Sequence, residues 1–260
     1  MFIDGALGSR GAALIDEYSD DPGNRGLTVD SEEHLESVFR DALAIGFQVC
    51  THAIGDRGNN IVLNVYEKVF KTFTSQSESP RWRIEHAQVL QPSDIPRFRQ
   101  LGVLPSMQPT HATSDMYWAE ERLGRERIKG AYAWESLLQS GSMIVAGSDF
   151  PVEGVNPLWG FYAAVTRSDH TGYPQDGWYG EQKMTREEAA RCFTQWAAYG
   201  AFEEENKGTI EPGKWADITV FSKDIMQIPP MKILTSEVEM TIIGGRIVYQ
   251  KSAATTAVAQ

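Results

Sequence analysis

The stretch VCTHAIGDRG, residues 49–58, ends an apolar run with a histidine and then breaks into a Gly-Asp turn. A strand that only builds a core has no need of an imidazole at its end, whereas a strand that delivers a ligand or a base to a site does. Two other apolar runs end in a comparable way, RWRIEHA at His86 and SMIVAGSDF at Asp149. These three strand ends are the basis for predicting the fold and the function.

Helical and strand patterns alternate around these runs. Helices are predicted over 30–44, 60–70, 94–100, 120–129, 131–140 and 157–167, and a capping box at 185–188 opens another. This alternation is typical of a parallel sheet, so the predicted fold class is α/β. After Lys207 the pattern changes to short strands with a hairpin at Gly244-Gly245, and the tail 251–260 is predicted to be disordered.

Composition and charge exclude several classes of partner. The 260 residues carry a net charge of −11 without a Lys/Arg cluster, which argues against nucleic acid and anionic membranes. No apolar run is long enough to span a membrane, and no signal-peptide pattern is present. Cys50 and Cys192 are too few for a disulfide framework, so a reduced, cytoplasmic chain is expected. Hydrophobic residues make up 42%, enough for one large domain, alone or with a small appendage.

The three strand ends suggest a metal site. Strand alternation is expected to point His52, His86 and Asp149 into one interior, at the carboxyl ends where parallel sheets and barrels build their sites. Two imidazoles and a carboxylate suit a divalent ion such as Zn²⁺, and an aspartate beside the ion can take a proton from the attacking water. A single strand-end histidine more often forms a cap or a hydrogen bond. The hypothesis of a metal site therefore depends on three strands ending in the same way, and not on any single histidine.

Alternation also makes predictions about the neighbouring side chains. Trp82 and Ile84 are expected to share the face of His86. Arg83 and Glu85 are expected on the opposite face, as an ion pair under a helix.

The chain resembles the metal-dependent amidohydrolase superfamily, in the branch that contains N-substituted formamide deformylase-like proteins. The matching stretches, in chain order, are FIDGALGSRGA (2–12), THAIGDRG (51–58), RIEHAQ (83–88), PSMQPTHATSD (105–115), AGSDFPVEGVNP (146–157) and GTIEPGKWADITVF (208–221). The resemblance implies a partial TIM-type (β/α) barrel of about strands 4–8 over residues 1–205. It also implies a C-terminal segment of a composite β-sandwich domain over 206–250.

The resemblance further implies hydrolysis of a non-peptide C–N bond, in an amide, a formamide or a related small molecule. It makes His52 and His86 metal ligands, and Asp149 both a ligand and the general base. His111, Asp4 and Phe150 are the candidate substrate-binding residues. The implied cofactor is a divalent metal, zinc first, with one or two ions in the full-length protein, and a homodimer is left open.

Two features of the family pattern are missing. The family uses a His-x-His pair at the end of its first strand, but the five histidines here are all isolated. Many members carry a carboxylated lysine at the end of strand four, just before the stretch that here reads MFIDG. We therefore expect the C-terminal part of a longer protein, poorly stable and weakly active or inactive alone. A non-catalytic or degenerate fragment and a metal-dependent deaminase remain as alternatives.

Overall fold

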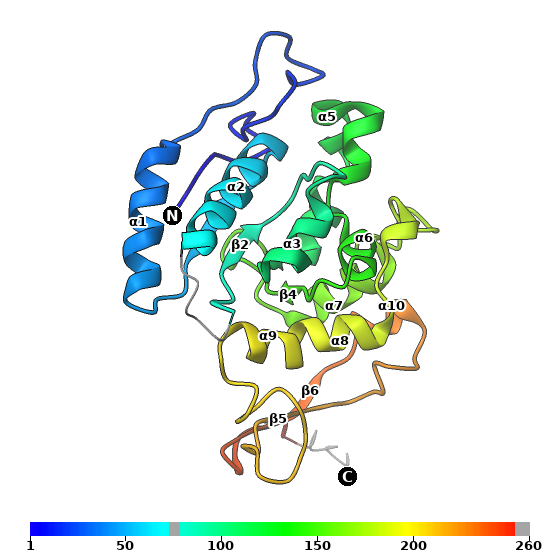
Figure 1. The fold of residues 1–260 in the computed structure, drawn as a ribbon. Coiled ribbons are helices and arrows are strands. Elements are labelled where there is room, and N and C mark those ends of the chain that lie inside the picture. The colour runs from blue at the N-terminus through cyan, green and yellow to red at the C-terminus, as the bar shows by residue number, and fades with distance from the viewer. Residues whose placement is uncertain (73–78, 253–260) are drawn as a thin grey trace, which may run out of the picture.

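The computed structural model describes residues 1–72 and 79–252, which form an α/β body with a small antiparallel sheet attached (Figure 1). The body contains a parallel sheet with the strand order β1-β2-β3-β4. Its strands are β1 (Cys50–Ala53), β2 (Arg83–His86), β3 (Leu104–Met107) and β4 (Val145–Ala146). The predicted α/β class with a parallel sheet is thus confirmed.

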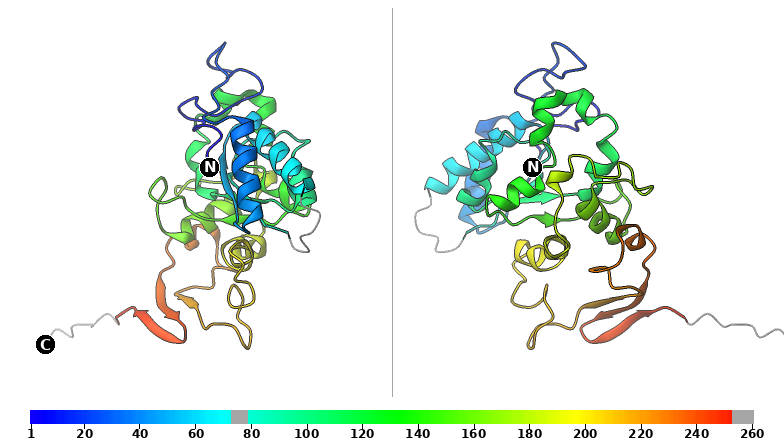
Figure 2. Two further views of the ribbon diagram at one scale, coloured as in Figure 1. Left: turned by 60° about the vertical axis from the view of Figure 1, so that its left-hand side comes forward. Right: turned by 90° about the vertical axis from the view of Figure 1, so that its right-hand side faces the viewer.

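Helices connect successive strands and pack beside the sheet (Figure 2). They are α1 (Glu32–Ala44), α2 (Asp56–Thr72), α3 (Ile95–Leu101), α4 (Pro109–Asp115), α5 (Ala119–Arg127), α6 (Trp134–Gln139), α7 (Pro157–Thr166), α8 (Arg186–Phe193), α9 (Gln195–Gly200) and α10 (Pro230–Ile233), with 3₁₀ turns η1 (Ile128–Gly130) and η2 (Gly180–Gln182). None of the helices in the described ranges has the length and apolar character needed to cross a lipid bilayer.

The helix ends follow signals that the sequence carries. At the start of α1, the Ser31 side chain accepts a hydrogen bond from the His34 amide. At the start of α8, Thr185 and Glu188 form a reciprocal capping box. Helix α3 ends at Gly102, whose φ of 66° lies in the left-handed region that glycine adopts at little cost. The predicted capping box at 185–188 is confirmed.

The outer face of the parallel sheet packs against α1 and α2. Trp82 is fully buried, and its ring lies 5.6 Å from Phe39, 4.9 Å from Tyr66 and 5.0 Å from Phe70, between ring centroids. Aromatic pairs of this kind contribute roughly 0.5–1.5 kcal/mol each beyond their area burial. Ile84 of β2, two residues further along the chain, is also fully buried. This face anchors the strands to the helices.

His86 therefore does not share the face of Trp82 and Ile84, and that prediction was wrong. The last residue of β2 has a φ of 73°, so the alternation of the strand ends before its side chain. His86 turns away from the helices and toward His52, the residue that precedes its register partner Ala53 on β1.

The Arg83–Glu85 ion pair exists, with Nε and Oε1 2.9 Å apart, but on the inner face of the sheet. Its register partners are Cys50 and His52, and the Arg83 guanidinium reaches Gln48. Arg83 Nη1 also donates to the carbonyl of Gly200, the last residue of α9, at 3.5 Å, so the pair contacts a helix on the face opposite Trp82 and Ile84.

The fourth strand is shorter than the run SMIVAGSDF suggests. Only Val145 and Ala146 have strand geometry, and Gly147 donates its amide hydrogen to Met107 just beyond. Asp149 follows in a turn with a φ of 58°. A turn, and not strand alternation, therefore places this side chain.

The N-terminal residues run parallel to β1. The amide of His52 donates to the Met1 carbonyl at 2.9 Å, and the amide of Ile3 donates to the His52 carbonyl at 3.0 Å. Phe2 and His52 form a parallel bridge. The segment that precedes Asp4 thus lies beside the strand that carries His52.

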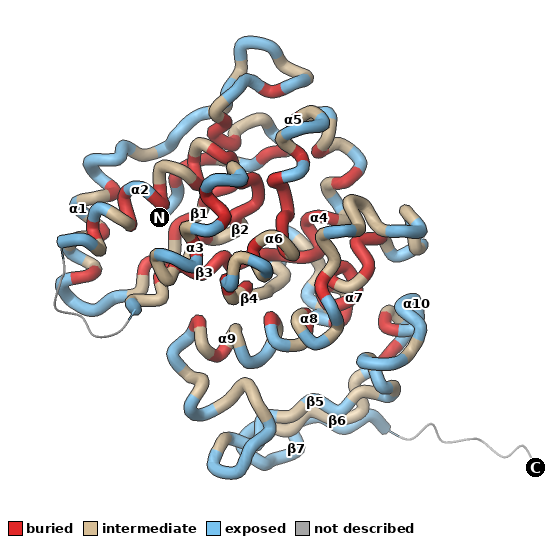
Figure 3. The backbone as a smooth tube through the Cα atoms, turned by 45° about the vertical axis from the view of Figure 1, so that its right-hand side comes forward, coloured by how far each residue is buried: buried red, intermediate tan, exposed pale blue. Residues whose placement is uncertain are grey.

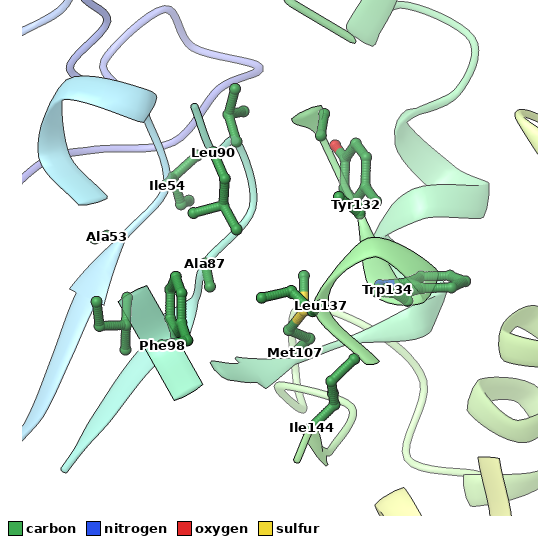
Figure 4. Close-up of a cluster of buried hydrophobic side chains, with 14 of the residues drawn as sticks. Ala53, Ile54, Ala87, Leu90, Phe98, Met107, Tyr132, Trp134, Leu137 and Ile144 are labelled. Carbon is green, nitrogen blue, oxygen red and sulfur yellow. The ribbon is translucent and has the colours of Figure 1, made fainter. Parts of the chain in front are cut away.

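Buried side chains fix the carboxyl ends of the strands relative to the helices (Figure 4). Ile54, Ala87 and Met107, from the ends of the first three strands, are all buried in a cluster with Phe98 of α3 and Leu137 of α6. The strand ends are therefore held by a continuous apolar core.

The C-terminal strands form a separate antiparallel sheet in the order β5-β6-β7, made of β5 (Ile218–Phe221), β6 (Val238–Ile243) and β7 (Arg246–Gln250). The predicted hairpin is present, with φ values of 55° at Gly244 and 78° at Gly245. Much of this sheet is exposed, unlike the body (Figure 3). The domain boundary at 205–206 stays a prediction, and residues 253–260 of the predicted disordered tail lie outside the described residues.

Candidate active site

The carboxyl edge of the parallel sheet brings four of the predicted site residues into a row. His52 and His86 come from the ends of β1 and β2, His111 from α4, and Asp149 from the turn after β4. Parallel strands end at the same edge, which is why residues far apart in sequence meet here. The row runs in that order along the edge.

His52 and His86 are in direct contact. Their ring centroids are 4.6 Å apart, with an interplanar angle of 76°. Nδ1 of His86 lies 2.9 Å from Oε1 of Gln108, the residue that precedes α4. Because an amide oxygen only accepts, this contact places the proton of neutral His86 on Nδ1 and leaves a lone pair on Nε2. The hydrogen bond to Gln108 therefore leaves Nε2 of His86 available as a ligand atom or as a base.

His111 continues the row. Its ring stacks on His86 with centroids 5.7 Å apart, and its Nε2 lies 3.8 Å from Oδ2 of Asp149. This nitrogen is buried and has no hydrogen-bond partner. Burial, reinforced by His86, lowers the pKa of His111 to about 4. His111 is thus a neutral imidazole near pH 7, with a buried nitrogen close to the carboxylate of Asp149.

His52 is similarly buried and neutral. Burial lowers its pKa to about 4 and His86 adds to this effect, while the Gly5 backbone works against it. Its Nε2 is buried without a hydrogen-bond partner, 3.5 Å from Oδ1 of Asp4. The ring also lies 5.1 Å from that of Phe2, between centroids. Neutral imidazole is the form that binds metal ions.

Asp4 is a buried carboxylate whose oxygens are occupied by the backbone. Oδ1 accepts from the amide of Ile54 at 3.0 Å, and Oδ2 accepts from Gly55 at 2.8 Å and Ala13 at 2.9 Å. Burial raises its pKa to about 6 against these hydrogen bonds, which lower it. The side chain has 0% exposure. Its contact with a substrate stays a prediction, and the geometry gives it a tethering function in the fold.

Asp149 and Phe150 lie at the exposed end of the row. The Asp149 side chain is 38% exposed, and Phe150 is 64% exposed. The same loop exposes Val152 and Val155, so its rim is apolar. Ser114 of α4 holds the loop through a 2.6 Å hydrogen bond to Glu153. The structure thus puts a carboxylate and an aromatic ring where solutes can reach them.

One polar group of this region was missed by the sequence interpretation. Oδ2 of Asp115, at the end of α4, accepts from the Tyr132 hydroxyl at 2.6 Å and from Nε2 of Gln88 at 3.3 Å. Burial raises the pKa of Asp115 to about 6. Asp115 and Gln88 close two of the matching stretches, which was a signal, but Tyr132 lies outside them all. The network ties the loop after His86 to the helix that carries His111.

The donor atoms fit part of a metal site. His52 and His86 are adjacent imidazoles, and imidazole nitrogens are suitable ligands for a divalent ion. However, nowhere in residues 1–72 and 79–252 are three or more His, Cys, Asp or Glu side chains grouped so that they could hold an ion. Asp149 approaches His111 and does not complete a cluster with His52 and His86. The ligand set His52, His86 and Asp149 therefore stays a prediction.

Known proteins are similar in sequence to this chain over nearly its whole length. A protein named "Putative amidohydrolase YtcJ" from Bacillus subtilis is 37% identical over 254 residues, which cover 97% of this chain and 47% of that protein. The N-substituted formamide deformylase of Arthrobacter pascens is 24% identical over 258 residues, covering 97% of this chain and 45% of that enzyme. The chain thus spans about half the length of the curated relatives that it matches.

Solved structures agree with the sequence relatives. The crystal structure of an uncharacterized metal-dependent hydrolase from Pyrococcus horikoshii superposes with a TM-score of 0.72 and 32% identity, over 82% of this chain and 41% of that one. The model of the amidohydrolase family matches residues 1–249, which include the parallel sheet, the row of histidines and all but the last residue of the C-terminal sheet. The chain therefore belongs to the amidohydrolase family.

Proposed function

We propose that the chain provides the carboxyl-edge half of the active site of a metal-dependent hydrolase that cleaves a non-peptide C–N bond in a small molecule. One observation carries the proposal: His52 and His86, from the ends of adjacent parallel strands, meet with their ring centroids 4.6 Å apart. Both belong to stretches that resemble the family. The substrate class, an amide or formamide, is suggested by the name of the deformylase relative.

In this proposal His52 and His86 hold a divalent ion, with zinc as the first choice. The bound ion would polarise the substrate carbonyl and favour ionisation of the attacking water. Gln108 keeps His86 in the tautomer whose Nε2 has a free lone pair. Burial keeps His52 neutral near pH 7 and thus able to donate a lone pair.

Asp149 is the proposed general base. It takes a proton from the attacking water and then passes it to the nitrogen that leaves as the C–N bond breaks. His111 lies 3.8 Å away and faces the same carboxylate, so it is placed to orient Asp149 or a polar group of the substrate. The exposed ring of Phe150 is the proposed contact for an apolar substituent.

The second candidate is a non-catalytic chain that keeps the fold without a working site. It is favoured by the absence of a three-ligand group within the described residues and by five isolated histidines in the sequence. Metal binding separates the two candidates.

The test is equilibrium dialysis of the purified chain against Zn²⁺, followed by measurement of bound metal. We expect the wild type to retain zinc and the double variant His52→Ala/His86→Ala to lose it. The matched control is His34→Ala, because His34 lies on α1 with a 58% exposed side chain, and zinc binding should not change. Equal zinc contents in the wild type and the double variant would favour the non-catalytic candidate.

Activity is tested separately with a panel of N-substituted amides and formamides in the presence of Zn²⁺. Asp149→Asn keeps the size of the side chain and removes the base, so hydrolysis should fall by roughly 10²–10⁴-fold. The zinc content of this variant shows whether Asp149 is also a ligand. Unchanged hydrolysis by a folded Asp149→Asn variant would rule out its role as the base.

A further inference from the structure

The surroundings of Asp4 suggest a function that its sequence position does not reveal. This side chain is one of the most completely buried carboxylates of the chain, yet no Lys or Arg side chain forms an ion pair with it among the described residues. Its partners are three backbone amides and the ring of His52. Burial of a carboxylate is costly unless hydrogen bonds compensate it, and here the three backbone amides do so.

The three amides belong to two separate segments. Ile54 and Gly55 form the turn directly after β1, whereas Ala13 lies in the long N-terminal segment. Asp4 therefore ties the turn that follows His52 to the segment beside it. Gly55 allows this close approach, since a Cβ there would lie 2.0 Å from the Ala13 carbonyl oxygen.

The fourth neighbour is His52 itself. Oδ1 of Asp4 lies 3.5 Å from Nε2 of His52, which is too long for a strong hydrogen bond but is the position of an acceptor. Nε2 is buried, has no hydrogen-bond partner and cannot reach water. A carboxylate at this place favours the tautomer that carries its proton on Nε2, because it attracts an N–H and repels a lone pair.

We infer that Asp4 is a positioning residue that holds the His52 ring in one orientation and in the Nε2–H tautomer. It acts through the proximity of its Oδ1 to Nε2 of His52 and through its hydrogen bonds to the amides of Ile54 and Gly55. The inference deepens the proposed function, since an oriented His52 matters most if it binds an ion. The orientation itself does not depend on that function and can be measured without metal or substrate.

The experiment uses the ¹⁵N-labelled chain, metal-free and near pH 7. Long-range ¹H–¹⁵N correlation spectra distinguish protonated from unprotonated ring nitrogens in each of the five histidines. The His52 signals are assigned as those absent from His52→Gln. We expect His52 as a single Nε2–H tautomer in the wild type. A wild-type ring protonated on Nδ1 would overturn the inference without any further variant.

The Asp4→Asn variant should convert His52 to a mixture of both tautomers. Its control is Asp56→Asn, because Asp56 is also a buried carboxylate that accepts backbone amides, from Ile15 and Arg57, in the same region. Both variants should lower stability, but only Asp4→Asn should change the His52 spectrum. An unchanged His52 spectrum in a folded Asp4→Asn chain would contradict the inference, as would an equal change in Asp56→Asn.

A second variant covers the case in which Asp4→Asn does not fold. A Cβ at Gly58 would lie 2.7 Å from Oδ2 of Asp4, so Gly58→Ala displaces the carboxylate while its charge remains. We expect Gly58→Ala to raise the proportion of the Nδ1–H tautomer of His52. If His52 keeps its single tautomer in this variant, a purely structural function of Asp4 is the better explanation.

Discussion

The outer face of the parallel sheet and the C-terminal sheet contain similar side chains but bury them very differently. Trp82, directly before β2, is fully buried against α1 and α2, whereas Tyr249 in β7 is 48% exposed and Ile247 is 55% exposed. Every residue of β7 is exposed. Apolar residues stabilise a fold only when other elements remove them from water. The body is therefore expected to carry the stability of the chain, with the C-terminal sheet as a weakly held extension.

Replacing Trp82 by Ala should have the largest effect. The change removes the ring that joins Phe39, Tyr66 and Phe70, and large cavities of this kind cost about 3–5 kcal/mol of unfolding free energy. The counterpart Tyr249→Ala, on the exposed strand, should cost about 0.5 kcal/mol or less. Urea unfolding of both variants measures the difference. If both variants lose a similar unfolding free energy, the different burial of the two regions does not produce a difference in stability.

A pH-dependent loss of stability should come from Asp115. Burial raises its folded pKa from 3.8 to about 6, so the folded state holds the proton to higher pH than the unfolded state does. The stabilising contribution is present below pH 3.8 and is lost as the pH rises to about 6. The shift corresponds to roughly 3 kcal/mol at most.

The variant Asp115→Asn should remove this contribution. Its unfolding free energy should fall less than that of the wild type between pH 4 and pH 7, as measured by urea unfolding at both values. The exposed Asp41→Asn on α1 serves as the control and should follow the wild type. A parallel pH dependence in Asp115→Asn and wild type would mean that Asp115 titrates normally.

The link between the two regions should depend on Arg186. This first residue of α8 donates to the carbonyls of Ile225 and Ile228, in the segment that leads from β5 to β6. Hydrogen bonds from a charged donor contribute about 1.5–3 kcal/mol when buried. Partial exposure reduces the expected loss to roughly 1–2 kcal/mol.

For Arg186→Ala, amide exchange in β5–β7 should accelerate by about tenfold while exchange in β1–β3 is unchanged. Arg191→Ala is the control, because Arg191 lies on the same helix and its side chain pairs with Glu187 on the surface. Faster exchange throughout the body would mean that the two regions unfold together and that the contrast between them is smaller than their burial suggests.

The sequence was informative where a local signal decides the structure. Capping residues predicted the start of α8, glycines at Gly244 and Gly245 predicted the hairpin, and apolar runs predicted the parallel strands. The three strand ends also predicted that His52, His86 and Asp149 lie at the same edge of the sheet. Such features depend on a few adjacent residues, so the chain alone reveals them.

The sequence was less informative where the backbone departs from regular geometry or where distant segments meet. His86 and Asp149 both adopt a positive φ, which strand alternation does not predict. At the end of β2, this places the His86 side chain on the face opposite Trp82 and Ile84, and not on their face as predicted. The Asp115–Tyr132 contact and the burial of Asp4 arise from tertiary packing. The row of site residues was thus predicted by name, whereas its geometry required the fold.

The smallest effect is expected at the hairpin of the C-terminal sheet. Gly245 has a φ of 78°, and a Cβ there meets no atom within 4 Å, so Gly245→Ala tests backbone conformation alone. A side chain in the left-handed region costs roughly 1 kcal/mol. Amide exchange in β6 and β7 should accelerate by about fivefold, since each 1.4 kcal/mol corresponds to about tenfold.

The control for Gly245→Ala is Gly147→Ala in the body, where a Cβ also meets no atom within 4 Å and no positive φ is required. That variant should be neutral or slightly stabilising, because alanine restricts the unfolded chain. The two changes add the same methyl group to open space, so any difference between them reports the backbone. If Gly245→Ala leaves exchange in β6 and β7 unchanged, the hairpin is not held in its left-handed turn, and the C-terminal sheet is even less constrained than its exposure indicates.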